Sequence, residues 1–499
     1  MRKSNRILKR RRYDGQKDIF DALQARYGNL FCILIIFFTI DIFPFTFYHL
    51  RMTDIQAVSL FHMYCAISLI ALVLYIPRLL YYVSGFKKPK RLFNPVQNRF
   101  AVIVPARNES AGIGLLLDSL ARQTYDRKKF DTFVIVDSED DPTCTIAKKY
   151  KSTYVQVVEN QRCKGMALDG SLKKLLSGTY GSYDAYIIID GDNIASDDFI
   201  EEMNNGLASG AQIVLGKREV KNYLLGGKKL RSLATNCSAL TYTFLDKMGN
   251  AFRTKAGIPC TMCGTGVMIR RDVIEKLGGW PYRSFTEDLE MTINAILHGW
   301  SSCFYEYAVV YTEEAISHKM LDRRRARWLI GYMQISFKYR NKIAKQTYAS
   351  LHDRSLSVVQ KIRGIRIRNF DFLYGFGPLF LFFGNTAVCF VLYMIASGID
   401  YCNRGFINFS ALKYGLVIML ILYGALVFYT FIALIIDPKA LKITFGEKLA
   451  VLLYNPFFIA EYAYFYGMAF FTLLRDPHYG EDVSWQQIER IETVIKEAE

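Results

Sequence analysis

The sequence predicts an α/β domain with a mainly parallel sheet, inserted between transmembrane α-helices. Three observations support this fold class. The chain of 499 residues is 51% hydrophobic, and its longest apolar runs lie toward the two ends. Between them, short β-branched and aromatic runs alternate with helix-like segments, a pattern typical of a parallel sheet covered by helices. The net charge is +17, and basic segments flank the apolar runs.

Five apolar runs are each about as long as a helix needs to cross the hydrocarbon core of a bilayer. Asn455 and Pro456 interrupt the fifth run, so it either crosses the membrane or lies at the interface, and the side of the C-terminus stays undetermined. Asp41 and Glu461 lie within the first and fifth runs. A charge is costly in lipid, so both acids face protein or a cavity, or they join helices by polar contacts. The runs comprise residues 30–48, 57–83, 372–397, 414–436 and 449–474.

Basic segments indicate the orientation of these runs. The sequences MRKSNRILKRRR, KKPKR and KIRGIRIRN precede the first run, follow the second and precede the third. By the positive-inside rule, the N-terminus and residues 87–371 are therefore cytoplasmic. The charge thus reports topology and contact with membrane lipid. Because no nucleic-acid recognition motif accompanies it, we expect no nucleic-acid partner.

The order of these features divides the chain into six predicted parts. They are a basic cytoplasmic tail (1–28), two transmembrane helices (29–83), a cytosolic α/β domain (97–318), amphipathic interface helices (319–370), two or three C-terminal transmembrane helices (371–475) and a polar tail (476–499).

The α/β part begins where the pattern changes at Phe100. Its apolar strands are continuous rather than alternating, which is typical of parallel strands buried on both faces. Helices are predicted over 111–123 and 163–176. The predicted strands comprise residues 100–106, 132–137, 153–158 and 185–190.

Polar, acid-rich clusters follow three of these strands, at 105–109, 137–141 and 190–193. Asp and Asn are common turn formers after strands. However, ligands of open α/β sheets bind beyond the carboxyl ends of the strands, so three clusters at this edge favour one shared site. In the D-G-D of the last cluster, Asp190 and Asp192 can share a hard divalent cation. Gly191 allows close approach of the backbone to a ligand.

The segment SFTEDLEMT (284–292) has two interpretations. Ser284 and Glu287 fit a helix capping box, and the apolar positions that follow have helical spacing up to a stop at Gly299. The acids of the first turn then complement the helix dipole. This structural interpretation explains Glu287 but does not require Asp288. The alternative is that one of the acids is a catalytic base.

Two further segments carry candidate binding residues. The sequence CGTG forms a predicted tight turn that opens an apolar run, and DRRRARW places four arginines beside Trp328. For Arg323 and Arg325 we expect contact with lipid headgroups. An Arg–Trp pair can instead bind a pyrophosphate and stack on a sugar ring.

The ordered set P-A-R-N-E, an Asp after the second strand, K-G, D-G-D, C-G-T-G, T-E-D and R-x-x-R-W resembles the membrane-embedded processive family 2 glycosyltransferases. These include cellulose, chitin, hyaluronan and poly-N-acetylglucosamine synthases. The resemblance covers about 91–334 and the flanking apolar runs. It implies a GT-A-like nucleotide-sugar-binding fold in a multi-pass protein of the plasma membrane. It also implies inverting synthesis of a β-linked polysaccharide from a UDP-sugar, with export through the enzyme's own channel.

The resemblance implies donor-binding roles for five matching residues. Asp137 would lie at the uridine of the nucleotide, and Lys164 near its diphosphate. Pro105, Arg107 and Glu109 would line the uridine pocket.

The remaining motifs imply the metal, catalytic and acceptor residues. Asp190 and Asp192 would hold the nucleotide and a Mg²⁺ or Mn²⁺ ion, and Arg327 would steady the leaving diphosphate. Asp288 would be the general base, with Glu287 mainly as cap and positioning residue. The residues implied to contact the acceptor are Gly264, Thr265 and Gly266, which lie beneath it, and Trp328, at the channel mouth.

Arg324 stands where the resembling family usually has Gln, which bears on the substrate subclass and on processivity. The segment VSWQQIER (483–490) is similar to a short Trp/Arg tail of some relatives. The implied partners are UDP-glucose or UDP-N-acetylglucosamine as donor, a growing glycan and membrane lipid. The sequence does not distinguish the sugar, the linkage, the oligomeric state, or whether export or accessory subunits take part. The alternatives are transfer of one sugar to a membrane lipid, or a nucleotide-sugar-binding scaffold without turnover.

Overall fold

A computed structural model describes residues 54–226, 230–369, 377–405, 409–476 and 479. The chain divides into two compact units, one comprising residues up to 72 with 379–422, and the other 73–378 with 423–499. Four sequence-based predictions lie outside the described residues: the basic tail, the first apolar run, Asp41 within that run, and the segment 483–490.

The larger unit is the one that comprises 73–378 with 423–499. Its described part contains an eight-stranded sheet, in which the strands lie in the order β3-β2-β1-β4-β7-β6-β8-β5. The four strands from β3 to β4 are parallel, β7 runs antiparallel to both of its neighbours, and β6 is parallel to β8. The prediction of a mainly parallel sheet is confirmed. The strands are β1 (Phe100–Pro105), β2 (Phe130–Val136), β3 (Thr153–Val157), β4 (Ala185–Ile188), β5 (Ile194–Ala195), β6 (Ile213–Val220), β7 (Val267–Arg270) and β8 (Ser302–Thr312).

The sheet is buried on both faces because alternate residues of its central strands meet different helices. On β1, Val102 and Val104 belong to the core beneath α4 and α7, whereas Ala101 and Ile103 belong to the core beneath α6, α11 and α12. This two-sided burial explains the continuous apolar strands. The helices of this part are α4 (Ile113–Ala121), α5 (Pro142–Ala147), α6 (Lys164–Leu176), α7 (Phe199–Leu207), α8 (Asn222–Leu225), α9 (Leu233–Tyr242), α10 (Ala251–Ala256), α11 (Arg271–Leu277) and α12 (Glu287–His298), with a π-helical segment η3 (Thr243–Asn250).

The start of α12 differs from the predicted capping box. Thr286 occupies the N-cap position without a capping side-chain bond, and the Ser284 hydroxyl instead donates to Glu290 Oε2 at 2.8 Å. Glu290 is fully buried, so its carboxylate needs donors more than the helix end does. Lys338 and Tyr339 donate to Oε1, the other oxygen of this carboxylate. The predicted stop is confirmed, because Gly299 ends the helix with a φ of 68°.

The other long helices are α3 (Asp54–Phe86), α13 (His318–His352), α14 (Val358–Arg368), α15 (Gly377–Arg404), α16 (Phe409–Ile436) and α17 (Phe445–Arg475). Within the described residues, two helical segments are long and apolar enough to cross a membrane, Leu412–Ile436 and Phe445–Arg475. Val58–Leu74 and Gly384–Ile399 are shorter apolar segments.

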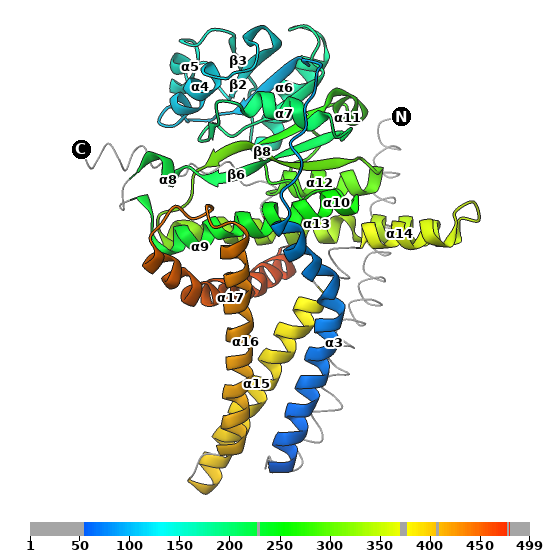
Figure 1. The fold of residues 1–499 in the computed structure, drawn as a ribbon, viewed down its shortest axis with the longest axis vertical. Helices are drawn as coiled ribbons and strands as arrows, with labels where there is room; N and C mark the ends of the chain where they lie inside the picture. The colour runs from blue at the N-terminus through cyan, green and yellow to red at the C-terminus, as the bar shows by residue number, and fades with distance from the viewer. Residues whose placement is uncertain (1–53, 227–229, 370–376, 406–408, 477–478, 480–499) are drawn as a thin grey trace, which may run out of the picture. The chain divides into compact units, whose positions relative to one another are not determined.

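Within the larger unit, α17 packs against α13 and α9, and Figure 1 shows these three helices on one side of the sheet. Arg325 of α13 joins the two long helices. Its side chain is fully buried, lies 2.6 Å from both Asp322 and Glu461, and donates to the Phe458 carbonyl. The expectation that Arg325 contacts lipid headgroups is therefore wrong, because protein acids and aromatic rings enclose its charge. Arg323, one residue earlier, is exposed.

Replacing Arg325 by Gln should destabilise the larger unit. The change leaves Glu461 opposite a neutral side chain. Because the Glu461 carboxylate is 37% exposed, the cost should be smaller than the roughly 3–5 kcal/mol of breaking a fully buried pair. The thermal unfolding midpoint of the detergent-purified protein measures the effect. Arg323→Gln, on the same helix, is the matched control and should leave the midpoint nearly unchanged. Equal midpoints for the two variants would contradict a structural role for Arg325.

Candidate active site

Lys164, at the start of α6, links several of the predicted site residues. Its Nζ lies 2.5 Å from Asp190 Oδ1 and 3.8 Å from Glu287 Oε1, and it donates to the Gly264 carbonyl at 2.7 Å. Burial alone would lower the pKa of Lys164, but Asp190, Glu287 and Asp288 together hold it above its ordinary value. The ammonium is therefore charged and joins segments that lie far apart in the sequence.

Glu287 and Asp288 occupy the first turn of α12. Burial raises the pKa of both carboxyl groups, and the nearby Lys164 acts in the opposite direction. Asp288 Oδ2 lies beside Gly264, where an added Cβ would come within 3.3 Å of it. The other oxygen of Asp288 accepts from the Leu289 amide at 2.8 Å. A partly buried carboxylate with a raised pKa beside a backbone turn is suited to act as a general base.

The D-G-D loop is fixed against the Gly264–Gly266 turn. Thr265 Oγ1 accepts from the Asp190 amide at 3.1 Å and from Asn193 Nδ2 at 2.5 Å. The turn depends on glycine, because Gly264 and Gly266 have φ values of 75° and 65°.

The far end of the D-G-D loop has a different set of partners. The Asp192 carbonyl accepts from Lys221 Nζ at 2.6 Å. At Gly191, an added Cβ would lie 3.4 Å from Glu109 and 3.5 Å from the Pro105 carbonyl. The residues after β1 therefore lie directly against this loop.

Arg107 and Asp137 form a separate contact at the ends of β1 and β2. Arg107 Nε lies 2.6 Å from Asp137 Oδ2, and Arg107 Nη1 donates to the Gln161 carbonyl at 3.3 Å. Because β1 lies between β2 and β4, Asp137 follows a strand that lies about 10 Å from β4, the strand that precedes Asp190.

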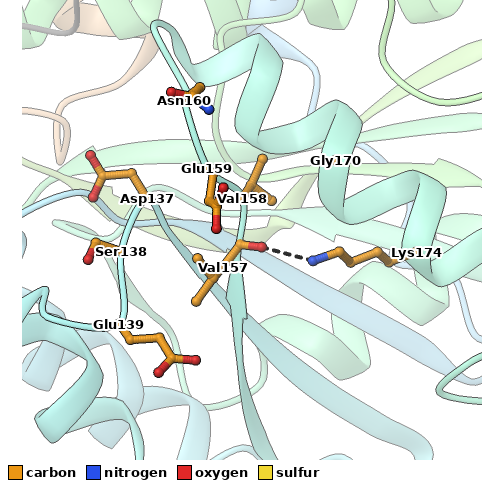
Figure 2. A pocket seen from close by; sticks show the side chains of 9 residues that line it. All are labelled: Asp137, Ser138, Glu139, Val157, Val158, Glu159, Asn160, Gly170 and Lys174. Atoms are coloured by element: carbon orange, nitrogen blue, oxygen red, sulfur yellow. Dashed lines mark hydrogen bonds between the residues drawn. The ribbon is translucent and has the colours of Figure 1, made fainter.

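An open cavity of about 900 Å³ adjoins Asp137 (Figure 2). This volume is in the range of ligand pockets for small molecules and cofactors. Lys174 of α6 lies at its wall and donates to the Val157 carbonyl at 2.8 Å. Of its lining residues, only Asp137, Ser138 and Glu139 belong to a polar cluster that was predicted from the sequence to lie at the site. Glu159 and Asn160, the polar residues that follow β3, were the sequence signal that could have indicated a further part of the lining. The cavity is lined by Asp137, Ser138, Glu139, Val157, Val158, Glu159, Asn160, Gly170 and Lys174.

Arg327 and Trp328 lie on the first turns of α13. Burial and the neighbouring Arg324 lower the pKa of Arg327, whereas Glu287, Asp288 and Asp190 raise it. Arg327 therefore lies in the field of the acids around Lys164. Its Nε atom is buried and has no hydrogen-bond partner among the described residues. The guanidinium of Arg324 lies 5.6 Å from the ring centre of Trp328.

Two carboxylates, Asp190 and Asp192, are the candidate ligands for a divalent cation. Within the described ranges, no group of three or more His, Cys, Asp or Glu side chains is arranged to hold a metal ion. Two carboxylates suit Mg²⁺, which is commonly held by one or two acids together with substrate phosphates. The donor set therefore fits a cation that shares its coordination with a diphosphate.

Residues 97–331 match the sequence profile of the family described as glycosyltransferase like family 2. They are a family 2 glycosyltransferase domain. The mainly parallel sheet of this glycosyltransferase domain is GT-A-like.

Similar proteins include several glycosyltransferases. The chain is 26% identical over 302 residues to the probable glycosyltransferase YdaM of Bacillus subtilis, covering 60% of this chain and 66% of that protein. It is 25% identical over 275 residues to a beta-monoglucosyldiacylglycerol synthase of Nostoc sp., covering 52% and 55%. It is 24% identical over 232 residues to a poly-beta-1,6-N-acetyl-D-glucosamine synthase of Staphylococcus aureus, covering 45% and 52%. The chain thus spans between half and two thirds of these relatives.

Solved structures with a similar domain include the mannosyltransferase PcManGT from Pyrobaculum calidifontis in complex with GDP-Man and Mn²⁺. Its TM-score is 0.47 at 18% identity, covering 79% of this chain and 98% of that chain. The S. aureus TarS fragment in complex with UDP-GlcNAc has a TM-score of 0.34 at 14% identity, covering 64% and 90%.

Proposed function

We propose that the protein is an inverting, metal-dependent glycosyltransferase that builds a β-linked polysaccharide from a UDP-sugar. The observation that carries the proposal is the partly buried cluster in which Lys164 joins Asp190 and Glu287, with Asp288 beside the Gly264 turn. The cluster offers Asp288 as a base and the Lys164 ammonium as a positive charge that can bind the diphosphate. Both lie within the family 2 domain. UDP-glucose and UDP-N-acetylglucosamine are the proposed donors, and a growing glycan is the proposed acceptor.

The proposed reaction is a single displacement. A sugar hydroxyl is a weak nucleophile, so the Asp288 carboxylate takes its proton as the oxygen attacks the anomeric carbon. The bond from that carbon to the diphosphate breaks at the same time, and the diphosphate leaves with the bonding electrons. Attack occurs on the face opposite the leaving group. An α-linked donor therefore gives a β-linked product.

The leaving diphosphate needs positive charge. In this proposal Lys164 and Arg327 contact it, and the buried Nε of Arg327 gains the partner that it lacks in the protein alone. A Mg²⁺ or Mn²⁺ ion held by Asp190 and Asp192 supplies neutralisation of the phosphate charge when bound. Asp137 and Arg107 hold the uridine end of the donor, next to the cavity after β2 and β3.

We also propose that the protein is a multi-pass plasma-membrane protein with a cytoplasmic glycosyltransferase domain. The two long apolar segments support this placement. Helix α14 supports an interfacial role for 319–370, because it exposes Val358, Val359 and Ile362 on the same helix as Arg363 and Arg366. Such a helix places apolar residues among lipid chains and its basic residues near anionic headgroups.

Transfer of a single sugar to a membrane lipid is the second candidate function. Among the similar proteins, monoglucosyldiacylglycerol synthases favour this alternative, and a poly-N-acetylglucosamine synthase favours polymerisation. Product length separates the two functions. A lipid that carries one sugar and never more would exclude a polysaccharide synthase.

The test is turnover by the purified protein in detergent, with a panel of UDP-sugars and with Mg²⁺ or Mn²⁺. Released UDP and product mass are measured together. We expect UDP release with UDP-glucose or UDP-N-acetylglucosamine, and a ladder of products that differ by one sugar. Absence of UDP release with every donor and metal would favour a scaffold that binds nucleotide sugar without turnover.

The acid side of the pH profile should depend on Asp288. Burial raises the pKa of this carboxyl group, and the base must be deprotonated to act. Turnover is therefore expected to fall as the pH decreases through the raised pKa, at a higher pH than for an exposed Asp, whose pKa is about 3.9. A kcat profile measured under saturating donor and metal tests this. A kcat that stays constant down to about pH 4 would contradict Asp288 as the base.

A further inference from the structure

Glu314, just beyond β8, is a buried carboxylate with an unusually complete set of partners. It is 1% exposed. Ser238 Oγ donates to it at 2.6 Å, Tyr242 donates its hydroxyl, and Arg324 Nη1 lies 3.1 Å away. The backbone of Glu314 is also held, because its amide donates to Asn222 Oδ1 at 2.9 Å. Glu314 is thus anchored to α8 and α9 before α13 begins.

Arg324 connects this anchor to the site. Its Nη1 pairs with Glu314, and its Nη2 donates to the Glu313 carbonyl at 3.0 Å. Arg324 lies three and four residues before Arg327 and Trp328 on α13, so the three side chains share one face of the helix. The preceding Arg323 is exposed. The two neighbouring arginines therefore have different surroundings on one helix turn.

Electrostatics explain why Arg324 needs a carboxylate at this point. Arg324 and Arg327 are close enough that Arg324 lowers the pKa of Arg327. Two guanidinium groups on successive turns repel each other, and the repulsion is stronger when both are partly buried. Glu314 balances the charge of Arg324. The charge of Arg327 then remains available to the acids around Lys164.

We propose that Arg324, held by Glu314, is a positioning residue that keeps Arg327 and Trp328 directed toward the substrate. This inference rests on the proposed function. Arg324 does not touch the reacting atoms in this account. It acts by fixing the first turns of α13 to the end of β8. The proposal gives the arginine at this position a defined role, where the resembling synthases usually have Gln.

The test compares Arg324→Met, Arg324→Lys, the double variant Glu314→Gln with Arg324→Met, and the exposed control Arg323→Met. A displacement of about 1 Å at a reacting centre can lower the rate about 10²-fold, so we expect Arg324→Met to lower kcat by about 10–100-fold. The KM for the donor should stay within about three-fold, because the Arg107–Asp137 contact is unchanged. Arg324→Lys keeps a charge opposite Glu314 and should recover most of the lost kcat.

The double variant separates positioning from folding. It removes both charges, so the thermal midpoint lowered in Arg324→Met should return toward the wild-type value, while kcat stays low. Recovery of kcat together with the midpoint would show a purely structural role and overturn the proposal. A kcat for Arg324→Met within two-fold of Arg323→Met would also overturn it. A wild-type protein that releases no UDP overturns the proposed function instead, and this inference with it.

Discussion

Replacing Asp288 by Asn should abolish sugar transfer and leave nucleotide binding largely intact. The amide keeps the size of the side chain and can still accept from the Leu289 amide. It is a far weaker base than a carboxylate, and general-base catalysis contributes about 10²–10⁴-fold to rates. We therefore expect kcat to fall by about 10³-fold or more. Released UDP measures kcat, and titration with UDP measures nucleotide affinity.

Glu287→Gln is the informative comparison for Asp288. Glu287 lies 3.8 Å from Lys164 and has a raised pKa, so its loss should disturb the cluster. In this account it positions Lys164 and does not take the proton. Its variant should retain more turnover than Asp288→Asn. Retained turnover in Asp288→Asn, or a larger loss in Glu287→Gln, would refute the assignment of the base.

Replacing Asp190 by Asn should lower kcat/KM by about 10²–10³-fold, the scale of removing one preorganised electrostatic partner of a transition state. Asp190 pairs with Lys164 at 2.5 Å, and in the proposed mechanism it also holds the divalent cation. The variant loses one of two carboxylate ligands and unbalances the charge of Lys164. Kinetics measured over a range of Mg²⁺ or Mn²⁺ concentrations should show a higher metal requirement.

Asp272→Asn is the control for Asp190, because this carboxylate has the same exposed fraction, 37%, but lies on α11, where it pairs with Arg270. It should leave the metal requirement unchanged. Chelation should stop turnover of the wild-type protein, and added metal should restore it. Full turnover of Asp190→Asn at the wild-type metal concentration would remove Asp190 from the metal site.

The central part of the fold was predictable from the sequence because its signals are local. The four parallel strands were found from their continuous apolar runs, and α6 was predicted over nearly its observed span. The antiparallel β7 between β4 and β6 was not predicted, because its place depends on pairings between segments distant in the sequence. The family resemblance and the family match agree over most of the α/β part.

The sequence indicated candidate site residues, but not the network of contacts among them. Nothing in the spacing of Lys164 and Asp190 indicates that they pair, because the contact depends on how α6 packs on the sheet. The predicted cap at Ser284 was wrong because a buried acid six residues later takes its hydroxyl. Arg325 was misjudged for a related reason, since its acidic and aromatic partners lie more than 130 residues away, apart from Asp322.

The anomeric configuration of the product tests the central claim most directly, namely one displacement driven by Asp288 opposite the diphosphate. The purified protein is incubated with an α-linked UDP-sugar, Mg²⁺ or Mn²⁺ and acceptor, and the new linkage is identified by NMR of the product. We expect a β-linkage that is formed together with released UDP. An α-linkage formed by the same protein would contradict it.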